Sequence, residues 1–260
     1  MKKWTAAIAA LGFIGVMGTS YAGVISPAGV MNKAYGKYNA RFKCWIAKGG
    51  QLNRPHCMKP VVLQQVSIEG KQVKFLLASG DEIDLSTGAS GGMGAHLSGG
   101  LIGMFVYSGP DSSPRIIAQE PKKELGAYGD APEGKFVRLG PDRYGWQFES
   151  GFTGQGYTDS WLQHYTLQKN GMSQYFIHSL GLIPIYHDDS GALEDESQVT
   201  VYAGKATIVN SDARDGFYPI HVTMERQVKG KKLPPQHYEI RYNYGKGEYA
   251  LPAGYPMEEP

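Results

Sequence analysis

The sequence lacks a membrane-spanning segment, a zinc-binding pattern and an internal repeat. A membrane-spanning helix needs about 20 apolar residues, and no segment after the N-terminal one approaches that length. Cysteine is scarce: there are two, Cys44 and Cys57, and they match no common zinc pattern even when His56 is included. No internal repeat of a solenoid or array is evident. These absences argue against a membrane span, a zinc site and a repeat protein.

The first residues have the pattern of a cleavable signal peptide. Lys2 and Lys3 precede an apolar stretch over Trp4–Met17, and the small residues Ser20 and Ala22 follow at the spacing that signal peptidase recognises. We therefore predict a signal peptide over residues 1–22 and a bacterial protein that is periplasmic or secreted. No cysteine stands directly after the predicted cleavage site, which argues against a lipid anchor.

The predicted exported chain has almost no excess charge of either sign. The full sequence holds 26 Lys+Arg and 24 Asp+Glu, and residues 1–22 contain two lysines and no acid, so 26 − 2 = 24 bases remain against 24 acids. A nucleic-acid-binding protein carries a basic excess or stripe, and an anionic membrane surface attracts a basic one. Neither partner is expected.

The residues after the predicted signal indicate a helical segment over 23–60, closed by a disulfide. Large apolar residues recur at spacings of four and three, which predicts a helix over Met31–Ile46 that ends before Gly49-Gly50. The residues are Met31, Tyr35, Tyr38, Phe42 and Trp45. Two cysteines in an exported chain favour a Cys44–Cys57 disulfide, with Cys44 on the last helical turn.

Residues 61–260 are typical of an all-β domain of mainly antiparallel strands. The 35 glycines and 17 tyrosines suit many strands and turns. Glu69-Gly70-Lys71 and Asn170-Gly171 predict hairpins, as does Ala203-Gly204 between Val199–Tyr202 and Lys205–Val209. Apolar and polar residues alternate strictly over 218–225 and 238–244, which predicts strands with one face exposed to solvent. A sandwich, an open barrel and a propeller-like stack all remain possible.

Two segments have partial catalytic or metal-binding patterns. His178-Ser179-Leu180-Gly181 shares part of the nucleophile elbow of α/β-hydrolases, but Ile177 replaces the first glycine and the following residues read as a strand, not as a helix. The acidic stretch with Asp188, Asp189 and Glu194 is a candidate calcium loop without the spacing of an EF-hand. The alternative is a hydrated loop between strands.

Three aromatic residues form the candidate binding site. Phe152, Tyr157 and Trp161 lie in or beside a stretch with Gly151, Gly154 and Gly156, which predicts a loop. Aromatic residues on such a loop supply contact area for recognition. The competing interpretation is that the rings fold back and plug the β core.

These features favour an exported non-catalytic binding protein over an enzyme, without deciding between them. The first hypothesis is an inhibitor or immunity-type protein that neutralises a partner in the cell envelope. The second is an envelope hydrolase acting on glycan or peptide, and the third is a structural or assembly factor. The expected partner is a protein or glycan of the envelope, and no cofactor is expected.

Overall fold

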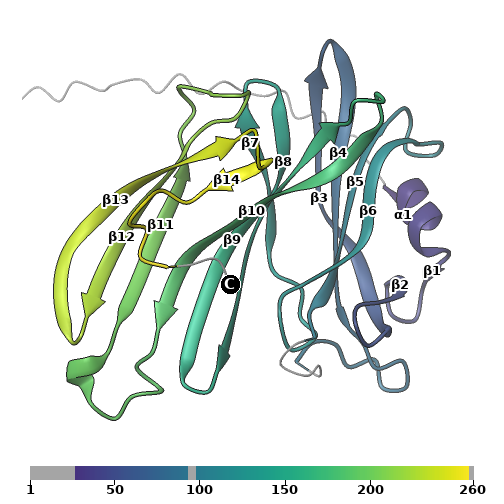
Figure 1. Ribbon diagram of the computed structural model, residues 1–260. Helices are drawn as coiled ribbons and strands as arrows, with labels where there is room; N and C mark the ends of the chain where they lie inside the picture. The colour runs from purple at the N-terminus through teal and green to yellow at the C-terminus, as the bar shows by residue number, and fades with distance from the viewer. Residues whose placement is uncertain (1–26, 93–97, 258–260) are drawn as a thin grey trace, which may run out of the picture.

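The computed structural model describes residues 27–92 and 98–257, which form two antiparallel sheets and one short helix (Figure 1). The predicted all-β architecture with one N-terminal helix is confirmed, and neither sheet is closed. The predicted signal peptide lies outside the described residues. No helix in the described part of the chain has the length and apolar character needed to cross a membrane.

Each sheet is a meander, in which strands adjacent in sequence are also neighbours in space. The six-stranded sheet comprises β1 (Tyr38–Asn39), β2 (Cys44–Gly49), β3 (Arg54–Ile68), β4 (Lys71–Glu82), β5 (Gly100–Ser108) and β6 (Arg115–Leu125). The eight-stranded sheet comprises β7 (Gly134–Gly140), β8 (Arg143–Gly154), β9 (Tyr157–Lys169), β10 (Tyr175–Asp188), β11 (Val201–Ile208), β12 (Ile220–Val228), β13 (Lys231–Asn243) and β14 (Glu248–Ala250). A one-turn 3-10 helix, η1 (Glu196–Gln198), lies between β10 and β11.

The helix is shorter than the apolar spacing predicted. Helix α1 covers Ala28–Tyr35 and ends at Gly36, whose φ of 85° leaves the helical region. The rest of the predicted helix forms β1, a turn and β2, so Tyr38 and Trp45 meet as a cross-strand pair instead of as helical neighbours. Cys44 therefore lies in β2. The predicted disulfide to Cys57 is confirmed, and it joins β2 to β3.

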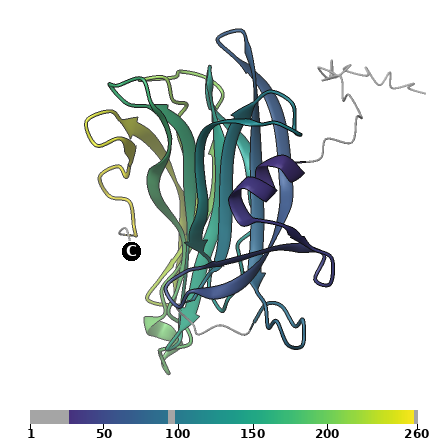
Figure 2. The same cartoon turned by 90° about the vertical axis from the view of Figure 1, so that its right-hand side faces the viewer.

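Helix α1 covers the outer face of the six-stranded sheet, as Figure 2 shows. Val30 and Met31 are fully buried there against β2, β3, β4 and β5. The indole Nε1 of Trp45 donates to Asn32 Oδ1 at 2.8 Å, which ties the helix to β2. The N-terminal helix is thus part of the first sheet's packing.

The inner faces of the two sheets pack against each other around large aromatic residues. Phe75 of β4 is fully buried, and its ring lies 5.4 Å from those of Phe136 in β7 and Trp146 in β8. Aliphatic residues of β4 and β5 fill the space around them, among them Leu77, Ile102 and Met104. This layer makes the molecule a sandwich over β7, β8 and β9.

Beyond β9 the eight-stranded sheet curls away and encloses a second core. One cluster combines Leu139 of β7, Leu162 of β9, Val222 of β12 and Tyr249 of β14, which are far apart along the sheet. The backbone N–H of Tyr218 donates to Leu139 O at 2.7 Å and links the two sides of the curl. Figure 1 shows β13 and β14 bent back toward β10. Strand β9 therefore has a hydrophobic cluster on each face.

The hairpins predicted from the sequence are confirmed in part. The turn at Glu69-Gly70 joins β3 to β4 with both φ angles positive, as a two-residue hairpin requires. The predicted hairpin at Ala203-Gly204 is wrong, because β11 runs straight through it between β10 and β12. Gly204 lies in a tightly packed part of the strand instead of in a turn: a Cβ there would lie 2.9 Å from Met224 Cε and 3.0 Å from Ile185 O.

Candidate recognition site

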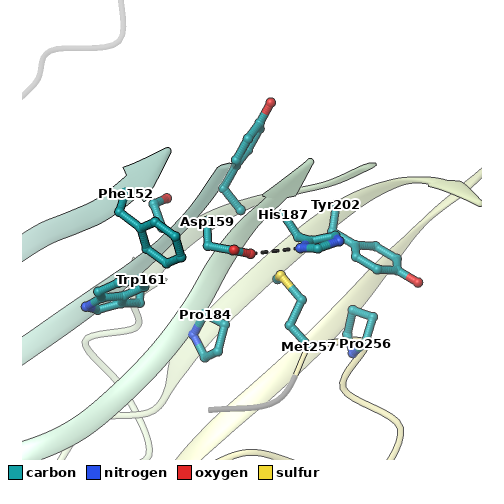
Figure 3. Close-up of a pocket in the computed structure, with 10 residues that line it drawn as sticks. Phe152, Asp159, Trp161, Pro184, His187, Tyr202, Pro256 and Met257 are labelled. Atoms are coloured by element: carbon teal, nitrogen blue, oxygen red, sulfur yellow. Dashed lines mark hydrogen bonds and ion pairs between the residues drawn. The ribbon is translucent and has the colours of Figure 1, made fainter. Parts of the chain in front are cut away.

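A depression of about 420 Å³ lies where β8, β9, β10 and β11 meet the last described residues of the chain. Figure 3 shows Phe152 and Trp161 on one side, Tyr202, Pro256 and Met257 on the other, and a joined pair of Asp159 and His187 between them. We call this hollow the aromatic depression. Its lining comprises Phe152, Asp159, Ser160, Trp161, Pro184, Tyr186, His187, Tyr202, Pro256 and Met257.

Strand register aligns four of these residues in one row across the sheet. Phe152 of β8 is opposite Asp159 of β9, Asp159 is opposite His187 of β10, and His187 is opposite Tyr202 of β11. Directly opposite residues in antiparallel strands have Cβ atoms about 4.5–5.5 Å apart, so their side chains interact. A register shift between Pro184 and Tyr186 sets this row. Without that bulge, His187 and Asp159 would not be paired.

The pair of Asp159 and His187 is the polar centre of the depression. The His187 Nδ1 and the Asp159 Oδ1 atoms are 2.7 Å apart. An ionised carboxylate only accepts hydrogen bonds, so Nδ1 carries the proton and donates it. The rings of Tyr157 and Tyr202 lie 6.5 Å and 6.3 Å from the imidazole. The hydrogen bond and the two rings hold the imidazole in one orientation.

The segment predicted as a loop over 151–161 is a β-hairpin. Its turn, Gln155-Gly156, has φ angles of 53° and 85°, as two-residue hairpin turns require. Gly151 lies inside β8, where a Cβ would come within 2.3 Å of the Asp159 carbonyl oxygen, so only glycine fits. Sequence reasoning took this glycine as a strand breaker, but close contact with β9 requires it.

The three aromatic residues proposed from the sequence lie in strands around one end of this hairpin. Phe152 and Tyr157 expose 44% and 42% of their surface, and Trp161 is half-buried. Phe152 and Trp161 both line the depression with ring centroids 6.3 Å apart at an angle of 57°. Tyr157 is not in the lining, but its ring approaches His187.

Two buried polar atoms in β8 and β9 have no hydrogen-bond partner among the described residues. They are the Trp161 Nε1 and the Oγ of Ser150, which stands opposite Trp161 in the β8–β9 pair. A buried donor without a partner costs about 1–3 kcal/mol.

Sequence reasoning missed the wall that the end of the chain provides. Tyr255 donates from its hydroxyl to the carbonyl oxygen of Pro184 in β10, and its ring packs 4.9 Å from Tyr238 of β13. This anchoring brings Pro256 and Met257 into the lining. No local pattern could have indicated it, because the contact depends on the curl of the sheet.

The acidic stretch after β10 uses its carboxylates within its own loop. Asp188 accepts from the Ser190 backbone N–H at 2.8 Å and from the Tyr186 hydroxyl at 3.1 Å, and Asp189 accepts from the Thr200 N–H at 2.7 Å. The hydrogen bonds from Ser190 are the largest cause of the lowered pKa of Asp188. Glu194 is exposed. Within residues 27–92 and 98–257, no group of three metal-ligating side chains gathers.

The segment that shares part of the nucleophile elbow forms no such turn. His178 lies near the start of β10, away from the aromatic depression, and its Nε2 is 2.8 Å from the Gly247 carbonyl oxygen. The following residues through Asp188 continue the strand, in agreement with the sequence prediction.

The chemistry of the depression is that of a shaped, mostly apolar surface with one carboxylate–imidazole pair. Such a pair orients an imidazole for proton transfer. In the part of the chain that the structure describes, no serine, threonine or cysteine side chain hydrogen-bonds His187. Comparisons of the chain with protein-family models, curated proteins and solved structures find no match.

Proposed function

We propose that this protein is an exported, non-catalytic binding protein of the bacterial cell envelope, of the inhibitor or immunity type. It neutralises a partner protein, which it contacts through the aromatic depression and the tip of the β8–β9 hairpin. The observation that carries the proposal is the exposure of Phe152 and Tyr157 beside a hollow that already contains Trp161. Large aromatic residues at such places dominate the energy of protein interfaces.

Leaving large aromatic rings exposed to water forgoes the free energy of burial, which favours a partner that covers them. Burying a large apolar side chain gains roughly 1.5–3 kcal/mol relative to leaving it in water, and two such rings stand together here. The Phe152 and Trp161 rings are inclined at 57°, so they form no flat platform for a sugar ring. A protein side chain that packs against both rings fits this geometry better than a glycan does.

The test uses the protein as bait in envelope extract, with single-alanine variants. We expect a partner protein to be retained by the unaltered chain and released by Tyr157→Ala and by Phe152→Ala, each with a loss of about 2 kcal/mol or more. The matched control is Tyr244→Ala, because Tyr244 is 78% exposed at the β13–β14 turn and does not line the depression. This control should keep the partner.

Melting curves separate this function from a structural role for the rings. As interface residues, Phe152 and Tyr157 can be replaced by alanine with little change in the melting temperature. If Tyr157→Ala instead loses about 3–5 kcal/mol of stability, as buried aromatic residues do, and still binds the partner at low temperature, the proposal is wrong.

The pair of Asp159 and His187 supports a second candidate, an envelope hydrolase acting on glycan or peptide. The pair would act as an acid–base group in the depression. Assays with cell-wall fragments and peptides test it: hydrolysis that disappears in His187→Gln, with the control His221→Gln still active, would establish the enzyme. His221 also pairs with a carboxylate, Glu239, but does not line the depression. No turnover above the His187→Gln background would exclude it.

A further inference from the structure

We infer that the aromatic depression receives a positively charged side chain, lysine or arginine, from the partner protein. This inference rests on the proposed function, because it names the group that the partner inserts. Three kinds of observation support it: the rings around the hollow, the carboxylate at its centre, and the distribution of charge along the strands that build it.

The rings offer π faces on both sides of the hollow. Phe152 and Trp161 stand on one side and Tyr202 on the other (Figure 3). A cation within about 6 Å of an aromatic centroid is attracted by the ring quadrupole, most strongly by tryptophan. Because the Phe152 and Trp161 rings are inclined at 57°, they form two walls of a corner that an extended side chain can enter.

The Asp159 carboxylate lies at the centre of these rings and retains acceptor capacity. Its side chain is 32% exposed, and one oxygen, Oδ1, accepts from His187. A carboxylate has about four lone-pair sites, so one hydrogen bond does not saturate it. Guanidinium and ammonium groups form charge-assisted hydrogen bonds to such an oxygen.

The stretch of chain that carries most of the depression is poor in basic residues, although β8 begins with Arg143, whose guanidinium lies 5.5 Å from the Phe217 ring, and β11 contains Lys205. Between Tyr144 and Tyr202 the sequence contains Lys169 as its only lysine and no arginine. Lys169 lies at the far end of β9, opposite Tyr175, with its ammonium group 5.7 Å from that ring. The acids of the same stretch are Glu149, Asp159, Asp188, Asp189, Glu194, Asp195 and Glu196.

Packing brings this acidic stretch next to the hairpin that carries the rings. A Cβ at Gly156 would lie only 2.3 Å from Ala192 N and from Gly191 C, so the hairpin tip sits directly on the acidic loop. Across the sheet, Arg226 of β12 lies opposite Tyr202. Its guanidinium donates to the Pro234 carbonyl oxygen, at 3.3 and 3.1 Å, and it does not line the depression. Between Tyr144 and Tyr202, seven acidic residues stand against one lysine, which favours a cation over an anion near the hollow.

Small probes test the inference without knowledge of the partner. N-acetyl-arginine amide and N-acetyl-citrulline amide have nearly the same shape but differ in charge. We expect the arginine probe to bind about tenfold more tightly, with the Trp161 indole N–H signal in NMR spectra as the reporter. Asp159→Asn should reduce this preference to about twofold or less. Phe152→Ala should weaken binding of the arginine probe, and the N-acetyl-lysine amide should behave like the arginine probe.

The matched control is Asp212→Asn, which removes an exposed carboxylate that pairs with Arg241 outside the depression. It should leave the charge preference intact. Equal binding of the arginine and citrulline probes would overturn the inference, and so would tighter binding of choline than of the arginine probe, since that assigns the hollow to a free quaternary amine. If Asp159→Asn keeps the partner while Tyr157→Ala loses it, the cation inference fails and the proposed function stands.

Discussion

The pH dependence of stability should be governed in part by one buried histidine. His164 of β9 is 1% exposed in the second core, with its ring 5.9 Å from that of Tyr249. Neither ring nitrogen has a hydrogen-bond partner among the described residues. Burial, with the charge of Lys135 as a smaller cause, lowers the pKa of His164 from 6.5 to about 3. The folded protein therefore holds this imidazole in its neutral form.

The sign and size of the effect follow from proton linkage. Below the ordinary pKa of about 6.5 the unfolded chain takes up a proton that the folded chain refuses, so stability falls as the pH decreases toward 3. From about pH 6.5 to about pH 4.5, the free energy of unfolding falls by about 1.36 kcal/mol for each pH unit. Over these two pH units, His164 alone therefore lowers it by about 3 kcal/mol. Above about pH 6.5 this histidine contributes no pH dependence.

Urea unfolding at about pH 8 and about pH 4.5 measures this contribution when the chain is compared with His164→Leu. Other histidines and carboxylates titrate in both proteins, so the difference between the two pH-dependent losses isolates His164. We expect the unaltered chain to lose about 3 kcal/mol more than the variant on acidification. At about pH 8 the variant should be no less stable, because it removes two unpartnered nitrogens. Equal losses in the two proteins would refute the reasoning.

Three further predictions concern the rest of the chain. Replacing both Cys44 and Cys57 by alanine should lower the free energy of unfolding by about 3 kcal/mol, as expected for a loop of about 15 residues; an unchanged urea midpoint would contradict this. Phe75→Ala should cost about 3–5 kcal/mol, because its ring fills the space between the sheets; a calorimetric scan would detect the shift. N-terminal sequencing of exported material should give a start near Gly23, and an intact Met1 would rule out cleavage.

Local signals in the sequence predicted the features that depend on neighbours along the chain. The turn at Glu69-Gly70 needs two residues with positive φ, and the alternating strands β12 and β13 need one buried face; both requirements are visible in the residues themselves. The disulfide followed from the pairing of two cysteines in a chain predicted to be exported.

Glycine caused two of the errors, because the sequence does not distinguish a glycine in a turn from a glycine required by close packing. Gly151 and Gly204 lie inside strands, where neighbouring backbone or side chains leave little room for a Cβ. The predicted helix is too long for a different reason: Tyr38 and Trp45 meet across a hairpin, and their spacing of seven residues also fits two helical turns.

Only part of the candidate site could be predicted from the sequence. Phe152, Tyr157 and Trp161 are recognisable in the sequence as aromatic residues among glycines. The pairing of Asp159 with His187 depends on the bulge in β10, and the wall of Pro256 and Met257 depends on the curled sheet. Both are contacts between distant parts of the chain, and one sequence contains no measure of them.

Strand β9 has consequences for how the protein unfolds, because each of its faces belongs to a different core. Leu162 packs into the core inside the curled sheet, and Tyr165 packs into the core between the two sheets. Neither half of the molecule can lose its packing without exposing one face of this strand. We therefore expect the sandwich and the curl to melt in a single cooperative transition, with β9 among the last amides to exchange with solvent.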